Sequence, residues 1–269
     1  MNIQCEKCKG LSFNNEQGRS KNSCCHGGKV ILENLNPFPQ ELEDLLNRKT
    51  ALSNDYLQNI RIYNNAFAFA SFNAKNEDIA GRGPYCMRIR GQPYKMATTS
   101  LYAASNPRYG QIYIYDDNET INFRQNSKLN NEILLYLQTV LRNNPYADSY
   151  RYFHEVCKEK GDNSVSLNFV SYATDDKRPY NVPTTNNIAA VITTCDGSVP
   201  YSIGVKVYPR NEQECDYLSN LSHHSDPMLF PLLFPHGEGG CSHAMKTENM
   251  KNILPLQYYS FMAASLNNI

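Results

Sequence analysis

The feature of this sequence that most constrains its fold is a cysteine-rich head, residues 1–29. Cys5 and Cys8 form a C-x-x-C pair, and after fifteen further residues the chain continues with Cys24, Cys25 and His26. The head contains few large hydrophobic residues, so burial alone cannot hold it together and a cross-link is needed. A C-x-x-C turn brings two thiolates to one tetrahedral ion, and a distant second pair completes the site.

The cysteine content of the whole chain favours a metal over disulfide bonds. Nine cysteines leave one unpaired in a disulfide framework. The first ten residues lack the apolar stretch of a secretory signal, and no apolar run approaches the roughly 20 residues of a membrane span. We therefore expect a soluble intracellular protein with one structural Zn²⁺. Its ligands would be Cys5, Cys8 and two of the three residues Cys24, Cys25 and His26; the alternative is a floppy head with free thiols.

Residues 30–250 have the pattern of an α+β fold, with a largely antiparallel sheet and several flanking helices. Apolar residues at helical spacing predict helices over residues 39–49, 53–63, 129–141, 147–160 and 255–266. Alternation and short apolar runs predict strands over residues 67–72, 85–90, 111–116, 165–170, 187–193 and 201–207. We also predict a polar loop over 73–83, a turn at 91–93, and a short helix or buried loop over 226–235.

Basic residues with aromatic neighbours suggest a nucleic-acid contact, although acidic and basic residues balance at 26 each. Local stripes of charge matter more for binding than the net charge. Single-stranded DNA requires cations for its phosphates and rings for its bases. The candidate residues are Arg61, Arg82, Arg88, Arg90, Tyr94 and Lys95. Alternation places Arg88 and Arg90 on one exposed face of a strand; the alternative interpretation is an ordinary solvated strand face.

Motifs for catalysis are missing from the sequence. There is no P-loop, no G-x-S-x-G and no kinase signature. Tyr258 and Tyr259 could suggest a nucleophile, but such a tyrosine needs a metal, typically held by a His–hydrophobe–His pair that this sequence lacks. We interpret the tyrosine pair as helix packing, and we interpret His223, His224 and His236 as polar residues around a proline-rich turn. The chain is not expected to be an enzyme.

Several stretches, taken together, carry a family resemblance. They are Asn59–Asn64, Gly83–Gln92 with Tyr94, Gln111–Asp116, Arg178–Thr184 and Asp226–Glu238. In this order and at these spacings they resemble the N-terminal region of Helitron-type Rep–helicase proteins. The stretch Cys24–Val30, following a C-x-x-C pair, is similar to the zinc finger of that family. The resemblance covers nearly the whole chain.

The resemblance implies a parent that processes DNA in the nucleus, a rolling-circle transposase. In that family a Rep nuclease and a superfamily 1 helicase follow this region, and residues 251–269 resemble the opening of the Rep-like domain. The chain would then be a non-catalytic DNA-recognition or accessory region, a fragment or solo remnant. Its partners would be single-stranded or transposon-end DNA and the remaining Rep and helicase domains. A second hypothesis is a zinc-stapled protein-interaction or scaffold module that binds no nucleic acid.

Overall fold

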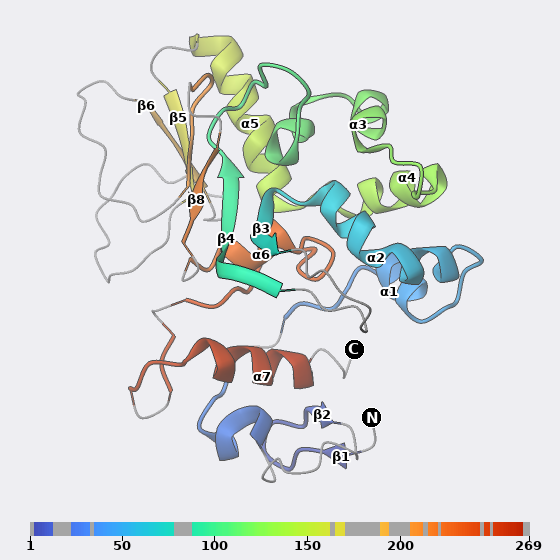
Figure 1. Ribbon diagram of the computed structural model, residues 1–269, viewed down its shortest axis with the longest axis vertical. Helices are drawn as coiled ribbons and strands as arrows, with labels where there is room; N and C mark the ends of the chain where they lie inside the picture. The colour runs from blue at the N-terminus through green and yellow to red at the C-terminus, as the bar shows by residue number, and fades with distance from the viewer. Residues whose placement is uncertain are drawn as a thin grey trace.

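The computed structural model describes most of the chain and shows helices together with antiparallel sheets, as predicted (Figure 1). The described residues are 3–12, 23–32, 35–77, 88–161, 165–169, 189–193, 205–211, 215–219, 222–242, 245–247 and 250–265. Among them, no helix is long and apolar enough to cross a membrane.

The named strands of the described residues pair antiparallel in three small sheets, of order β1-β2, β3-β4-β8 and β6-β5-β7. They are β1 (Ile3–Gln4), β2 (Leu11–Ser12), β3 (Ala70–Glu77), β4 (Arg88–Thr98), β5 (Val165–Phe169), β6 (Ala189–Thr193), β7 (Lys206–Val207) and β8 (Cys215–Leu218). The first sheet belongs to the head. The other two form part of residues 30–250, which we call the body.

The helices of the described residues include two short 3₁₀ segments, η1 (Ser23–Gly28) and η2 (Tyr109–Ile114). The α-helices are α1 (Gln40–Leu46), α2 (Ser53–Phe67), α3 (Asp117–Arg124), α4 (Asn131–Val140), α5 (Pro145–Lys160), α6 (Ser225–Leu229) and α7 (Pro255–Ser265). In Figure 1, α7 lies between the head and the rest of the molecule.

Side-chain caps explain where three of these helices begin. The carboxylate of Asp116 accepts from the backbone N–H groups of the first turn of α3, and Asn130 and Asn144 accept in the same way at α4 and α5. These contacts satisfy backbone donors that have no partner within the helix. Pro145 follows at the first position of α5, where its missing N–H costs nothing.

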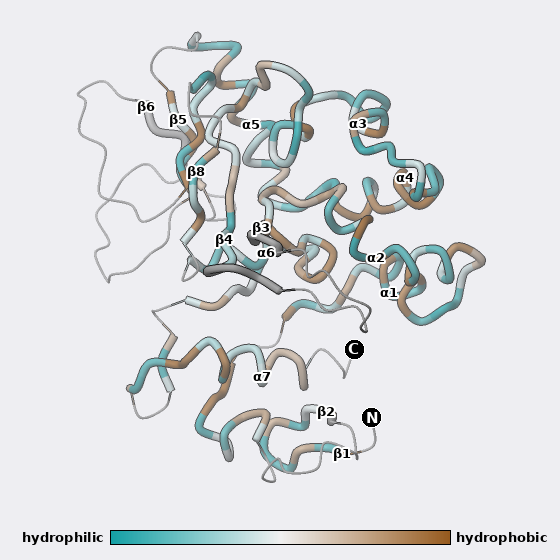
Figure 2. Tube along the Cα trace, viewed as in Figure 1, coloured by the Kyte–Doolittle hydropathy of each residue, from teal (hydrophilic) through white to brown (hydrophobic). Residues whose placement is uncertain are grey.

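Two hydrophobic clusters form the core of the body. Aromatic side chains dominate the first, where Phe69 stacks on Tyr113 and Tyr150 with ring centroids 4.4 and 6.2 Å apart. Aliphatic side chains such as Leu42 and Leu137 dominate the second, which lies between α1, α2 and α4. Hydrophobic and hydrophilic residues alternate around α4, so one side of the helix enters this core (Figure 2).

The strand predicted at 111–116 was wrong, because this segment forms η2. Gly110 approaches the ring of Tyr150 so closely that a Cβ atom there would collide with it. The side chain of Gln111 donates to the Ser100 carbonyl at 2.9 Å and accepts from the Arg108 N–H at 3.2 Å. Four consecutive residues from Gly110 to Tyr113 are buried, which tertiary packing permits and strand alternation does not predict.

The turn predicted at 91–93 was also wrong, because β4 continues through it. Asn73 of β3 pairs with Tyr94, whereas Lys75 pairs with Arg90, so β4 advances four residues while β3 advances two. Extra residues of this kind are accommodated as a bulge, where Pro93 needs no ladder partner for its nitrogen. Helix α2 and strand β3 divide the predicted strand 67–72, and β3 runs on to Glu77 through the predicted polar loop.

Candidate metal centre and nucleic-acid interface

Four cysteines of the head form a compact group. The sulfur atoms of Cys5, Cys8, Cys24 and Cys25 all lie within 4.8 Å of one another. The Sγ atoms of Cys5 and Cys25 are 3.7 Å apart, and those of Cys8 and Cys24 are 3.3 Å apart. The structure therefore brings together the predicted cysteine ligands, including both Cys24 and Cys25. His26 is exposed and lies outside this group.

Two tight turns present the four thiols to one another. In the first, the Cys5 N–H donates to the Gly10 carbonyl at 2.9 Å, and the Lys9 N–H donates back to the Cys5 carbonyl at 3.0 Å. In the second, η1 is kinked, with His26 at φ 48° and Gly27 at φ 70°. This left-handed step turns the His26 side chain away and lets adjacent cysteines point to the same centre. The arrangement is typical of a zinc-knuckle-like head.

The electrostatics of the group fit a cation. Burial raises the pKa of the Cys5 thiol, but hydrogen bonds from the Cys8 and Lys7 backbones and from neighbouring thiols outweigh it, so the pKa falls to about 7. Burial and the neighbouring thiols raise the pKa of Cys24 and Cys25. One thiolate therefore forms readily, while further thiolates repel it unless a cation lies between them. Four sulfur donors at this spacing suit Zn²⁺.

The head packs against α7. Cys25 and Val30 are fully buried in a cluster with Tyr258, Phe261 and Met262. Helix α7 also contacts β2 and η1. A Cβ atom at Gly10 would lie 2.7 Å from the Cβ of Ala264, so glycine is required for this close approach. The third core cluster thus joins the two ends of the described chain.

The described part of the chain places the residues that were predicted to bind DNA on two elements, α2 and β4. Arg61 is exposed on α2, the helix predicted over residues 53–63. Arg88 and Arg90 lie in β4, opposite Glu77 and Lys75; their side chains, like the whole of Arg82, lie outside the described residues.

Tyr94 and Lys95 are neighbours in β4, so their side chains point to opposite faces of the sheet. Tyr94 packs edge-on against Tyr217, with ring centroids 5.6 Å apart. Lys95 is buried, and its ammonium lies 3.5 Å from Oδ1 of Asp226. The prediction that Lys95 contacts phosphate is therefore corrected, because its charge is already paired inside the protein.

A different set of cations converges on one cleft that sequence analysis missed. The cleft, of about 290 Å³, is formed by η2, α3, α4, α5 and adjoining residues. Its lining includes three arginines, Arg124, Arg142 and Arg151, and two tyrosines, Tyr113 and Tyr115. Arg124, Arg142 and Arg151 lie on or beside three consecutive helices, and the packing of these helices brings their side chains together. Amphipathic spacing predicts each helix, but it does not predict how the helices pack against one another.

Arg124 is the buried cation of this cleft. Its guanidinium lies 4.4 and 4.8 Å from the ring centroids of Phe67 and Tyr113. It donates to neutral acceptors, the Ala66 carbonyl at 3.1 Å and Oε1 of Gln138 at 3.0 Å. Burial lowers the pKa of Arg124, but arginine stays charged in proteins. The cleft therefore contains a positive charge held by uncharged hydrogen-bond partners and aromatic faces.

Arg142 and Arg151 stand at the solvent side of the cleft. Arg142 pairs with Asp117 at 3.0 Å, and both side chains are more than half exposed. Arg151 pairs with Asp148 at 2.6 Å. Exposed ion pairs of this kind contribute little and exchange partners easily. Together the arginines can bind an anion. The ring of Tyr113 is buried between Phe69 and Arg124, whereas Tyr115 is partly exposed and offers an aromatic surface beside the anion.

Two of the histidines and both tyrosines that were discussed in the sequence analysis form hydrogen bonds within the protein. Nδ1 of His224 lies 2.8 Å from the Tyr146 hydroxyl in the core, and Nε2 of His236 lies 2.8 Å from the Pro37 carbonyl. Tyr258 accepts from the Gly240 N–H at 2.8 Å.

Comparison of the chain with protein-family models and with curated proteins gives no match, so the functional argument depends on the geometry of these sites.

Proposed function

We propose that this chain is a zinc-stapled, non-catalytic region that recognises single-stranded DNA, in keeping with its resemblance to the N-terminal region of Helitron-type transposases. One observation carries the proposal: three arginines converge on a single cleft that is also lined by the partly exposed ring of Tyr115. Sequence-tolerant binders of single strands combine cations that follow the backbone with rings on which bases stack. On this proposal the chain works in the nucleus, beside the Rep and helicase domains of its parent.

The charges of the cleft favour phosphate as the ligand. Among the described residues, the hydrogen-bond acceptors of Arg124 are neutral, the Ala66 carbonyl and Oε1 of Gln138. Arg142 and Arg151 can leave their exposed carboxylate partners and offer planar, bidentate donors to phosphate oxygens. A cleft of about 290 Å³ accommodates one strand, whereas duplex recognition usually places a helix or ribbon in a groove some 12 Å wide.

The zinc ion has a structural role in this proposal. Cys5, Cys8, Cys24 and Cys25 supply four sulfur ligands, which fills a tetrahedral coordination sphere. A catalytic zinc site keeps one position open for water or substrate. Zinc here would hold the two turns of the head together, and the nuclease and helicase chemistry would belong to the remaining domains of the parent.

The experiment compares two charge-removing double variants in binding to single-stranded oligonucleotides at several salt concentrations. Arg142→Gln with Arg151→Gln should weaken binding and lower the salt slope by roughly 1 to 1.4, since each lost phosphate contact on a single strand removes about 0.7. The matched control is Lys158→Gln with Lys160→Gln, which removes two exposed charges at the far end of α5. The control should keep the wild-type slope.

Two outcomes would count against the proposal. If the arginine variant binds with the wild-type slope, the cleft is not the interface. Arg88→Gln with Arg90→Gln then tests the contact expected from the sequence. If the zinc-loaded wild type fails to bind oligonucleotides even at low salt, recognition of DNA is wrong, and a protein-interaction module becomes the better description of this chain.

A further inference from the structure

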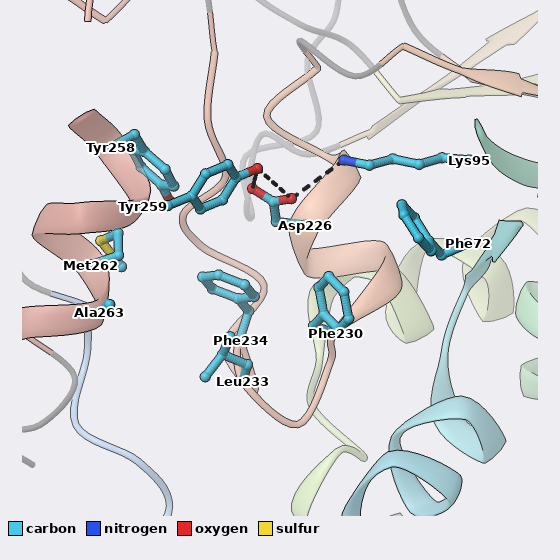
Figure 3. A pocket seen from close by; sticks show the side chains of 10 residues that line it. All are labelled: Phe72, Lys95, Asp226, Phe230, Leu233, Phe234, Tyr258, Tyr259, Met262 and Ala263. Atoms are coloured by element: carbon cyan, nitrogen blue, oxygen red, sulfur yellow. Dashed lines mark hydrogen bonds and ion pairs between the residues drawn. The ribbon is translucent and has the colours of Figure 1, made fainter. Parts of the chain in front are cut away.

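A second hollow lies on the other side of the β3-β4-β8 sheet from Tyr94, between the sheet, α6 and α7 (Figure 3). It has a volume of about 410 Å³, in the range of small-molecule sites. Its lining residues are mostly aromatic or aliphatic, and two of them are charged. They are Phe72, Lys95, Asp226, Phe230, Leu233, Phe234, Tyr258, Tyr259, Met262 and Ala263.

The charged residues of this pocket form a fixed, neutral pair. Lys95 and the Tyr259 hydroxyl reach Asp226 from opposite sides (Figure 3). The hydroxyl donates to the carboxylate oxygens at 3.2 and 3.1 Å, and the Cys241 N–H donates to Oδ2 at 3.2 Å. The carboxylate is thus well satisfied and rigid, while the positive and negative charges cancel. An anion entering here would meet Asp226 as well as Lys95, so the pocket disfavours phosphate.

The ammonium of Lys95 retains hydrogen-bonding capacity. Its side chain is 10% exposed, and an ammonium carries three N–H donors. Among the described residues Asp226 is its hydrogen-bond partner, at the long distance of 3.5 Å. Two donors therefore remain for an acceptor on a ligand. A buried cation with unused donors is costly, and a neutral ligand with an oxygen or nitrogen acceptor would remove that cost.

The walls of the pocket select for a flat ligand. Three aromatic side chains on different elements are considerably exposed: Phe72 on β3, Phe230 after α6 and Tyr259 on α7, at 56%, 42% and 44%. Single exposed hydrophobic residues are common, but a group of them around one pocket marks a binding site. Rings on several sides of a cavity suit an aromatic ligand, which stacks against them or meets their edges.

We infer that this pocket receives one unpaired base of single-stranded DNA, an inference that rests on the proposed function. The base lies between the aromatic walls, and an acceptor on its edge takes a hydrogen bond from Lys95. Proteins that hold an extruded base use this combination of stacking and edge contacts. The phosphate cleft is within reach, because Phe67 in the cleft and Phe72 in the pocket are five residues apart and five residues span at most about 18 Å.

The first experiment removes one base from the oligonucleotide and, separately, one aromatic side chain from the pocket. The probe is the shortest oligo-dT that the zinc-loaded chain binds, with one abasic site moved along it. For wild type, one abasic position should weaken binding about 5-fold or more. Phe72→Ala should weaken binding of the intact oligonucleotide by a similar factor. The affinity of this variant should no longer depend on that abasic position. Tyr152→Ala, an exposed aromatic residue of α5, should behave as wild type.

A second comparison tests the hydrogen bond. Replacing the sensitive thymine by difluorotoluene keeps the ring and removes its carbonyl acceptors. Wild type should bind this oligonucleotide less tightly than the parent, and Lys95→Met should bind the two equally. If Lys95→Met does not fold, the wild-type comparison alone decides the point.

The outcomes separate this inference from the proposed function. If Phe72→Ala binds as wild type, or no abasic position matters while the Arg142 and Arg151 variant still loses affinity, the base pocket is wrong and DNA binding stands. A pocket that takes an apolar side chain of a protein partner would give that result. If wild type binds no oligonucleotide, both proposals fail.

Discussion

The head and the body of this protein are held together by different means. In the head, the described residues form two two-residue strands and a kinked 3₁₀ helix, and among them Cys25 is the fully buried side chain. In the body, fully buried aromatic residues such as Tyr150, Phe153 and Phe169 fill a continuous core. A small segment cannot bury enough apolar surface to offset its conformational entropy. Four clustered thiols serve the head where a hydrophobic core serves the body.

The largest expected effect is loss of the metal from the head. The purified, reduced chain should contain about one zinc per molecule, and structural zinc sites bind with roughly 10–16 kcal/mol of apparent free energy. Cys25→Ser or chelation should remove the zinc, and amide hydrogen exchange should accelerate in the head while the helices of the body keep their protection. The matched control is Cys215→Ser, at a half-buried cysteine outside the group. Less than about half an equivalent of zinc would contradict a tetrahedral site.

The converse experiment weakens the body and spares the head. Phe153 is fully buried in the aromatic core, so Phe153→Ala should lower the free energy of unfolding by about 3–5 kcal/mol. Tyr152→Ala, at the neighbouring residue that is half exposed, should stay within about 0.5 kcal/mol of wild type. Denaturant unfolding measures both, and metal analysis should give the same zinc content. If Phe153→Ala loses its zinc under native conditions, the two regions are not independent.

A smaller effect is expected at the contact between α7, on which the head packs, and α6. Tyr259 of α7 donates to Asp226 of α6 at 3.1 Å. Tyr259→Phe removes this hydrogen bond to a charged group, and partial exposure of the ring reduces its contribution to about 1 kcal/mol. Tyr217→Phe, at an exposed residue outside this contact, is the control. Hydrogen exchange of α7 should accelerate in the first variant only; equal protection would show that Asp226 does not fasten α7.

The smallest effect concerns pH. Burial lowers the pKa of His223, because a buried imidazole resists protonation. The unfolded state, with a histidine pKa of about 6.5, then binds more protons than the folded state. This residue therefore favours folding above that pH and opposes it as the pH falls below about 6.5. Between pH 7 and 5, His223→Gln should lose less stability than wild type, by under about 1 kcal/mol; identical pH profiles would contradict this.

Sequence alone could predict what depends on local patterns. The helices around Tyr63 and Phe153 have clear helical spacing, and the cysteine pairs have local metal-ligand spacing, so both were predictable. The segment Gln111–Asp116 has the alternation of a strand, but the packing of Gly110 on Tyr150 decides its structure. Likewise, the arginine cleft depends on how the consecutive helices α3, α4 and α5 pack together, and the pairing of Lys95 with Asp226 joins residues 131 positions apart. Tertiary contacts of this kind leave no signal in a short window.

Helix α7 contributes side chains to two sites, the contact with the head and the aromatic pocket. The helix packs on Cys25 of the head and on Val30 directly after it, and it also contributes Tyr259 and Ala263 to the pocket. Because α7 contacts both the head and the pocket, a shift of the helix at one of these sites also changes the other. Binding free energies linked through a common element are reciprocal. If zinc in the head changes the affinity of the pocket for its ligand, that ligand must change the affinity of the head for zinc by the same factor.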